Sequence, residues 1–113
     1  SNISKIEEAQ AFHGSLFGSE AEELPKNFLE ILKPTYRQRG VGDYLSHIYV
    51  AMGCGEFALD FGFKPWDMAP LKIIVEEAGG IFTDAKGEKS VYSGSVITSN
   101  GLLHESLLKT LSK

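Results

Sequence analysis

The sequence predicts an α/β fold in which a largely parallel sheet lies between helices. Two observations predict this class: short apolar runs alternate with longer amphipathic segments along the chain, and glycine, proline or aspartate separates most of them. Crossovers between parallel strands are right-handed, so helices are expected on both faces of the sheet. A length of 113 residues with 42% hydrophobic residues suits one domain over residues 1–113.

The expected strands are short, and two of them carry informative patterns. In the third, Phe57, Leu59 and Phe61 alternate with residues that are polar or small, which is typical of a strand. In the second, Arg37 and Arg39 lie on the same side, where they would either bind a phosphate group or pair with glutamates of a neighbouring strand. The five predicted strands are Ala9–Gly14, Thr35–Val41, Glu56–Phe61, Ile81–Asp84 and Ser95–Thr98.

The expected helices follow from apolar residues at helical spacing. One helix ends before Pro34, and another begins after Asp43, which is a good N-cap. The helix Trp66–Ala78 has the strongest pattern and is closed by Gly79-Gly80, and a final helix is capped by Ser99 or Asn100. The expected apolar faces of the second and third helices are Leu45, Ile48, Tyr49 and Met52, and Leu71, Ile74, Val75 and Ala78.

Composition excludes several classes of function. Eleven basic and fifteen acidic residues give a net charge of −4, and the absence of a basic block argues against non-specific nucleic-acid binding. No apolar run approaches the roughly 18–20 residues that span a bilayer, so no membrane association is expected. The single cysteine, Cys54, cannot form an internal disulfide, which indicates a reducing compartment and most simply the cytoplasm.

Three of the four aspartates lie in or beside predicted turns at strand ends. These are Asp43, Asp60 and Asp67, whereas Asp84 ends a strand that leads into a turn. Ligands bind at the carboxyl ends of strands in such sheets, and the turn at Ser99-Asn100 is expected there as well. Short carboxylates on rigid turns suit Mg²⁺, although spacing alone favours helix capping over a ligand role for Asp43 and Asp67.

Asp67 carries one feature beyond capping. It shares a helix face with Leu71, Ile74 and Ala78, which is expected to be the buried face. A carboxylate entering a buried face costs several kcal/mol unless a metal or the free amides of the first helical turn meet it. The neighbouring Trp66 would be either a stacking platform for a substrate or, as favoured, part of the core.

Other chemical signatures are absent from the sequence. His13, His47, His104 and Cys54 do not lie at metal-ligand spacing. There is no glycine-rich phosphate loop and no serine nucleophile elbow. No catalytic residue is therefore predicted within this chain.

Three segments together resemble a known family. They are R-G-V-G-D-Y at residues 39–44, K-P-W-D-M-A-P at 64–70 and E-E-A-G-G at 76–80. They resemble the C-terminal half of the inositol monophosphatase family of Mg²⁺-dependent phosphatases, and this resemblance extends over nearly the whole chain. The opening segment, residues 6–29, together with residues 39–43, looks closest to the bacterial histidinol-phosphatase branch. The resemblance implies a layered sandwich in which a mixed, mainly parallel five-stranded sheet lies between helices.

The resemblance also implies roles for four residues. Asp67, within W-D-x-A-P, is implied to be a Mg²⁺ ligand, and Asp60, seven residues earlier, to contact hydroxyl or amine groups of the substrate. Asp43 and Tyr44 match the helix start that faces the leaving group of the substrate. The implied reaction is hydrolysis of a small phosphorylated metabolite by a water that Mg²⁺ activates.

The remaining metal ligands of the family, in a D-P-[IL]-D-G-[ST] segment and an upstream glutamate, have no match here. The chain is therefore interpreted as the C-terminal part of a longer enzyme, inactive and weakly Mg²⁺-binding by itself. Its expected partners are the missing N-terminal half and a second copy, through an apolar face. Histidinol phosphate, inositol phosphate and sugar or adenosine bisphosphates remain open as substrates. The second hypothesis is a truncated, non-catalytic relative that acts as an interaction or regulatory module.

Overall fold

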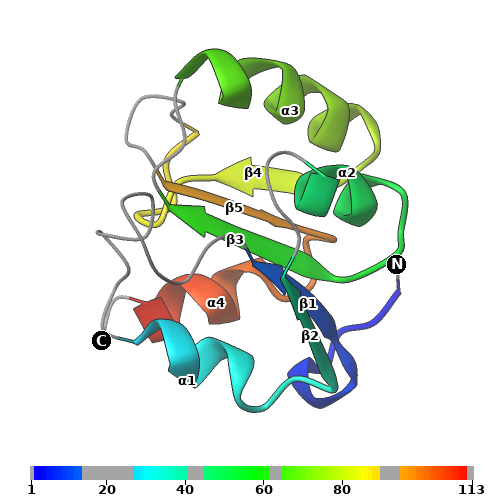
Figure 1. Ribbon diagram of the computed structural model, residues 1–113, viewed down its shortest axis with the longest axis vertical. Helices are drawn as coiled ribbons and strands as arrows, with labels where there is room; N and C mark the ends of the chain where they lie inside the picture. Colours follow the sequence, from blue (N-terminus) through cyan, green and yellow to red (C-terminus); the bar gives the residue numbers. More distant parts are fainter. Residues whose placement is uncertain (1, 14–26, 41–44, 62–64, 90–94, 112–113) are drawn as a thin grey trace.

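The computed structural model contains one five-stranded sheet with strand order β2-β1-β3-β5-β4 (Figure 1). It describes residues 2–13, 27–40, 45–61, 65–89 and 95–111, with the backbone alone for residues 65–67. The strands are close to those predicted. The first four are shorter than expected, and the last extends one residue further. Their bounds are β1 Gln10–His13, β2 Arg37–Gly40, β3 Phe57–Phe61, β4 Ile81–Thr83 and β5 Ser95–Ser99.

Four of the five strands run in the same direction. β1 pairs in parallel with β2 and β3, whereas β5 pairs antiparallel with both β3 and β4. The prediction of a mixed, mainly parallel sheet is confirmed. The turn at Ser99-Asn100 nevertheless lies at the end of the sheet opposite to the carboxyl end of β3, because Ser99 pairs with Phe57, the first residue of β3. The expectation that this turn joins the carboxyl-end site was wrong, since β5 runs against its neighbours.

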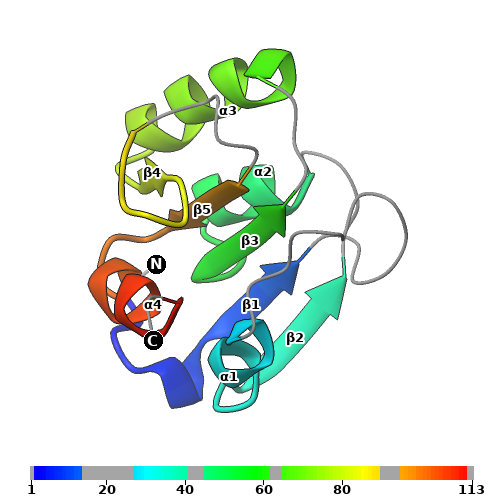
Figure 2. The same cartoon turned by 90° about the vertical axis from the view of Figure 1, so that its left-hand side faces the viewer.

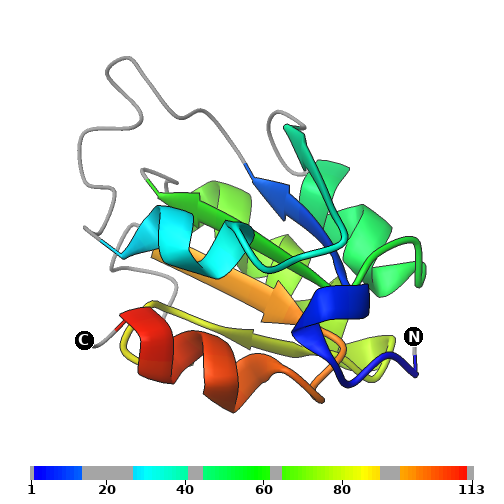
Figure 3. The ribbon, with the colours of Figure 1, turned by 90° about the horizontal axis from the view of Figure 1, so that it is seen from below.

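Helices cover both faces of the sheet, as predicted. α1 (Phe28–Leu32) and α4 (His104–Leu111) lie on one face, and α2 (Leu45–Ala51) and α3 (Pro65–Glu77) lie on the other (Figure 2). A short 3₁₀ helix, Ile6–Glu8, precedes β1. Figure 3 shows α1 and α4 side by side, and the side-chain amide of Asn27 donates a hydrogen bond to the carbonyl of Thr110 at 3.1 Å. Within the described residues, no helix is both long and apolar enough to cross a bilayer.

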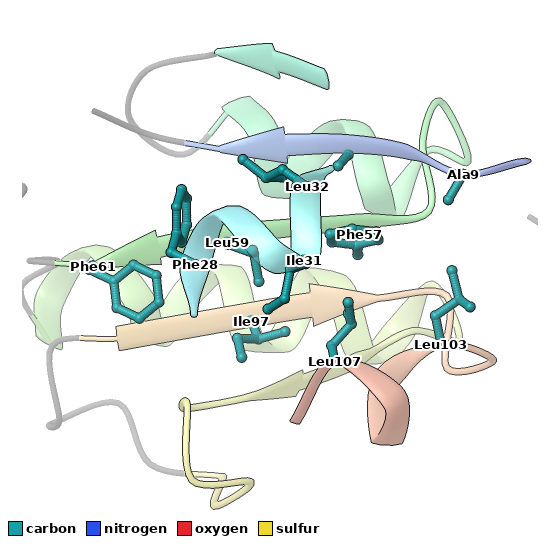
Figure 4. Close-up of a cluster of buried hydrophobic side chains, with 11 residues drawn as sticks. Ala9, Phe28, Ile31, Leu32, Phe57, Leu59, Phe61, Ile97, Leu103 and Leu107 are labelled. Atoms are coloured by element: carbon teal, nitrogen blue, oxygen red, sulfur yellow. The ribbon is translucent and has the colours of Figure 1, made fainter. Parts of the chain in front are cut away.

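The central strand β3 is buried on both faces. Phe57, Leu59 and Phe61 point towards α1 and α4, whereas Ala58 and Asp60 point towards α2 and α3. All five of its residues are buried because helices cover both sides of the sheet. The main cluster on the α1 and α4 side (Figure 4) consists of Ala9, Ala11, Phe28, Ile31, Leu32, Phe57, Leu59, Phe61, Ile97, Leu103 and Leu107.

The buried stripe of α3 differs from the predicted one. Leu71 and Val75 are buried as expected, and Met68 joins them against Phe82 and Val96 of the sheet. Ile74 is 43% exposed and Ala78 is exposed, so their assignment to the buried face was wrong. Stripes offset by one residue differ by about 100° of rotation, and only packing against β4 and β5 chooses between them.

The apolar face of α2 is also rotated from its predicted position. Leu45 and Met52 are 43% and 68% exposed, and the fully buried residues of the helix are Ser46, His47 and Val50. The prediction failed because hydrophobicity alone assigned the two polar residues to the solvent side. Their burial means that each needs a hydrogen-bond partner inside the fold.

The predicted caps of α4 form the turn before it instead. The hydroxyl of Ser99 accepts from the amide of Gly101 at 3.0 Å, and the side-chain oxygen of Asn100 accepts from the amide of Leu102 at 3.0 Å. These bonds stabilise an Asx-type turn, so the helix begins only at His104. The expectation that Ser99 or Asn100 caps the helix was therefore wrong.

Gly79 and Gly80 end α3, as the sequence predicted. The amide of Gly80 donates to the carbonyl of Val75 at 2.9 Å and that of Gly79 to Glu76 at 3.0 Å, which is the Schellman pattern. Gly79 has φ +90°, a region that side chains disfavour. A Cβ on Gly80 would lie 2.7 Å from the carbonyl oxygen of Ser99. The E-A-G-G segment is thus explained by helix termination and by close contact with β5.

Replacing these glycines is expected to destabilise the fold to different extents. Gly79→Ala places alanine in the left-handed region of backbone conformation, which costs about 1–2 kcal/mol. The added methyl group has no neighbouring atom within 4 Å, so it causes no steric clash. Gly80→Ala requires the backbone of β5 to move, so its loss of unfolding free energy should be larger. Urea denaturation of both variants measures the difference. An equal or smaller loss for Gly80→Ala would contradict the close contact with Ser99.

A buried histidine ties α4 to the sheet. His104 is 4% exposed, and its two ring nitrogens bond to hydroxyl groups of neighbouring strands. Nε2 lies 2.8 Å from Oγ1 of Thr83, and Nδ1 lies 2.8 Å from Oγ of Ser99. Burial disfavours the charged imidazole and lowers the pKa of His104 to about 4.

This pKa predicts a loss of stability in mild acid. An unfolded histidine has a pKa near 6.5, so between pH 6.5 and about 4 the unfolded state binds more protons than the folded state. The free energy of unfolding should therefore fall as pH decreases through this window, by up to about 1.4 kcal/mol per pH unit from this group. Urea denaturation at several pH values, with His104→Gln as the reference, isolates the contribution. Identical slopes for the two proteins would show that His104 does not cause it.

Candidate functional site

Asp60 is the predicted site residue whose side chain the structure describes. It is the fourth residue of β3 and lies close to the carboxyl end of that strand. Its side chain is on the face that α2 covers, and the residue is only 5% exposed. A buried carboxylate is stable only where donors or a positive charge compensate it, so the contacts of Asp60 define what this site can do.

Two residues of α2 supply those donors. Nε2 of His47 lies 2.9 Å from Oδ2 of Asp60, and the hydroxyl of Ser46 is directed to the same oxygen at a longer 3.4 Å. Nδ1 of His47 lies 2.7 Å from Oγ1 of Thr98 on β5. The imidazole, which is completely buried, therefore connects β5 to Asp60.

The chemistry of the contacts assigns the donor at one end of this network. A carboxylate accepts hydrogen bonds, so Nε2 of His47 carries the hydrogen that faces Asp60. At the other end, the hydroxyl of Thr98 donates to Nδ1 of a neutral imidazole or accepts from a protonated one. In both states every polar atom of the ring has a partner, and Oδ2 of Asp60 is held in place.

The other carboxylate oxygen remains open. Both hydrogen bonds of Asp60 fall on Oδ2, and Oδ1 receives none from a described residue. No fully enclosed side-chain nitrogen or oxygen of the described residues lacks a partner. Oδ1 is therefore not fully enclosed, and it can accept a hydrogen bond from a hydroxyl or ammonium group that approaches the site.

The remaining predicted site residues are placed less fully. Asp43 and Tyr44 lie outside the described residues. Asp67 is the third residue of α3, which begins four positions after β3 ends, and Figure 1 shows its first turn on the side towards which β3 points. The side chains of Asp67 and Trp66 are outside the description.

The argument that Asp67 enters a buried face is not supported. Of the three residues that share its face, Leu71 is buried, but Ile74 and Ala78 are exposed. No group of three or more histidine, cysteine, aspartate or glutamate residues that could hold a metal occurs in the part of the chain that the structure describes. The described side chains do not form a Mg²⁺ centre by themselves, since Mg²⁺ requires near-octahedral oxygen coordination.

Asp84 has a structural role. Its Oδ1 accepts hydrogen bonds from the amides of Lys86 and Glu88, both at 2.9 Å. The residue is 3% exposed, and these two bonds satisfy it within the turn that follows β4. Asp84 thus stabilises this turn through its described hydrogen bonds.

Arg37 and Arg39 lie on the same side of β2, as predicted. Together with Phe12 and Tyr49 they line a cavity of about 420 Å³. Neither arginine forms an ion pair with a described residue, so the pairing with glutamate is not observed there. Arg37 lies over the ring of Tyr36, 5.8 Å from its centre.

Sequence reasoning missed His47 and Thr98. A histidine that lacks metal-ligand spacing gives no signal, and a threonine in a strand is ordinary. The signal that was available is Val50, three residues after His47, which places the histidine on the same side of the helix as an apolar residue. Thr98 could be found only once β3 and β5 were known to be neighbours.

Comparisons with known proteins show the family and agree with the fold. The model of the inositol monophosphatase family matches residues 3–113, and the chain belongs to this family. It is 35% identical to a histidinol-phosphatase of Streptomyces coelicolor over 113 residues, which cover 100% of this chain and 42% of that protein. A histidinol-phosphatase of Mycobacterium tuberculosis is 34% identical over 111 residues, 98% of this chain and 43% of that protein.

A solved structure shows the same relationship. The inositol monophosphatase of Thermotoga maritima superposes with a TM-score of 0.83 at 33% sequence identity, over 99% of this chain and 43% of that one. The chain therefore spans less than half the length of the relatives that it matches. The family resemblance predicted from the sequence motifs is confirmed.

Proposed function

We propose that the protein containing this chain is a Mg²⁺-dependent phosphomonoesterase that hydrolyses histidinol phosphate or an inositol phosphate in the cytoplasm. This chain is its C-terminal domain. The observation that carries the proposal is the similarity to two histidinol-phosphatases along the whole length of the chain. The open oxygen of Asp60 supports it, because both substrates offer hydrogen-bond donors on the leaving group.

Residues around the carboxyl end of β3 would contact the substrate. Asp60 would accept a hydrogen bond from an ammonium or hydroxyl group, and Asp43 and Tyr44 would face the same leaving group. Asp67 would contribute one ligand to Mg²⁺. Because the sequence has no match to the D-P-[IL]-D-G-[ST] segment of the family, the other ligands would come from the part of the protein outside this chain.

The outer side of the α2 and α3 layer supports association with that part or with a second copy in a homodimer. Among the described residues of these helices and the turn after α2, four large apolar side chains are exposed, namely Leu45, Met52, Ile73 and Ile74, at 43%, 68%, 64% and 43%. Exposed apolar side chains of this size lose contact with water when a partner covers them, which favours binding.

The full-length protein is expected to hydrolyse histidinol phosphate or inositol 1-phosphate, and a chelator of divalent cations should abolish the activity. The isolated 113-residue chain should show no turnover, since it lacks most of the metal ligands. Release of inorganic phosphate under steady-state conditions measures both proteins. Turnover by the isolated chain, or full activity of the complete protein in excess chelator, would contradict the proposal.

Asp67→Asn in the full-length protein should lower kcat by about 100-fold or more, because a metal ligand supports several kcal/mol of charge stabilisation. Asp84→Asn is a matched control: it changes the same atoms in a carboxylate whose hydrogen bonds to described residues stabilise a turn. We expect it to lower the melting temperature and to leave kcat of the folded protein nearly unchanged. Unchanged kinetics for Asp67→Asn would reduce this residue to a helix cap.

A further inference from the structure

His47 makes a connection that the proposed reaction does not yet explain. It is fully buried, it holds one oxygen of Asp60, and its other nitrogen is fixed by Thr98 on the neighbouring strand. A carboxylate bound through one oxygen to a ring that cannot move presents its second oxygen in a fixed direction. By holding Oδ2, the network thus sets the direction of Oδ1 of Asp60.

We propose that His47 is a positioning residue that determines selectivity for the leaving group of the substrate. This inference rests on the proposed function. His47 does not reach the substrate itself; it holds Oδ2 of Asp60 so that Oδ1 meets the ammonium or hydroxyl group of the substrate. Loss of His47 therefore weakens recognition of leaving groups that carry such donors, and it leaves the transfer of the phosphoryl group to water largely intact.

The surroundings of Asp60 favour this role over simple core stability. Besides His47, the only donor to Asp60 from a described residue is Ser46, whose hydroxyl is at 3.4 Å, so His47 provides the shorter contact. Without it, the carboxylate loses its main restraint and is free to rotate about its side-chain bonds. Small displacements of a contact group reduce enzyme efficiency strongly.

His104 provides a matched control inside the same chain. It too is a buried histidine, and both of its ring nitrogens bond to hydroxyl groups, those of Thr83 and Ser99. It contacts no carboxylate through these bonds and lies on α4, on the other side of the sheet. Replacement of His104 therefore tests what a buried histidine contributes to stability alone.

The experiment compares two kinds of substrate in the full-length protein. The first is histidinol phosphate or inositol 1-phosphate, whichever the protein hydrolyses better, and the second is p-nitrophenyl phosphate, whose leaving group has no hydrogen-bond donor. For His47→Phe we expect kcat/KM to fall about tenfold or more for the first substrate relative to the second, mainly through KM. His47→Gln, whose amide can still donate to Asp60, should recover most of this selectivity.

Two further variants distinguish positioning from stability. Asp60→Ala should lose the same selectivity, and adding His47→Phe to it should cause no further loss, because the histidine acts through the carboxylate. His104→Gln should lower the melting temperature without changing the ratio between the two substrates. If His47→Phe misfolds, His47→Gln and Thr98→Val still test the inference, since each alters one end of the network. Thr98→Val should shift the ratio of kcat/KM between the two substrates in the same direction as His47→Phe.

The outcomes separate this inference from the proposed function. If kcat/KM fell equally for both substrates in every folded His47 variant, the positioning role would be overturned. The proposed phosphatase activity would be unaffected by that result. A full-length protein that hydrolyses neither natural substrate would overturn the proposed function, and the inference would fall with it. A selective loss that Asp60→Ala reproduces supports both.

Discussion

The carboxylate of Asp60 lies on a strand that is buried on both faces, and this constraint organises the surrounding structure. Phe57, Leu59 and Phe61 use one side of β3 for the main apolar cluster, so the alternate position of Asp60 must face α2. A charge at that position needs donors at short range. His47 supplies the main one, which means that the position of α2 relative to β3 and β5 is set by a polar contact as well as by apolar packing.

Two glycines after α2 allow the helix to lie where His47 can reach Asp60. Gly53 has φ +80°, and the amides of Gly53 and Cys54 donate to the carbonyls of Val50 and Tyr49, which ends the helix in a Schellman turn. A Cβ on Gly55 would overlap the ring of Phe12. The chain can therefore turn sharply from α2 into β3 only because these positions lack side chains.

Two buried histidines make similar polar contacts but have different roles. His104 binds Thr83 and Ser99 and fastens α4 to β4 and β5, whereas His47 binds Thr98 and a carboxylate. The difference lies in the partner: two hydroxyl groups give a closed structural link, whereas the carboxylate has a second oxygen to which no described residue donates a hydrogen bond. Neither histidine stood out in the sequence, because the role of each depends on strands that are distant along the chain.

Local pattern was sufficient for much of the fold. The five strands, the helices on both faces and the glycines that close α3 follow from alternation, helical spacing and turn residues, which act over a few neighbouring residues. The choice of Asp60 as a site residue followed from the resemblance to the family, and its placement at the carboxyl end of β3 agrees with that choice. Asp43, Tyr44 and Asp67 stay predictions, since their side chains lie outside the described residues.

The sequence by itself determined the class of fold, the family and the residues that form each element. Only the tertiary structure decided which face of α2 and α3 is buried, that β5 runs antiparallel, and that His47 and Thr98 support Asp60. The physical reason is that stripes offset by one residue are nearly equal in local energy. The choice between them is made by contacts between elements, which local periodicity does not contain.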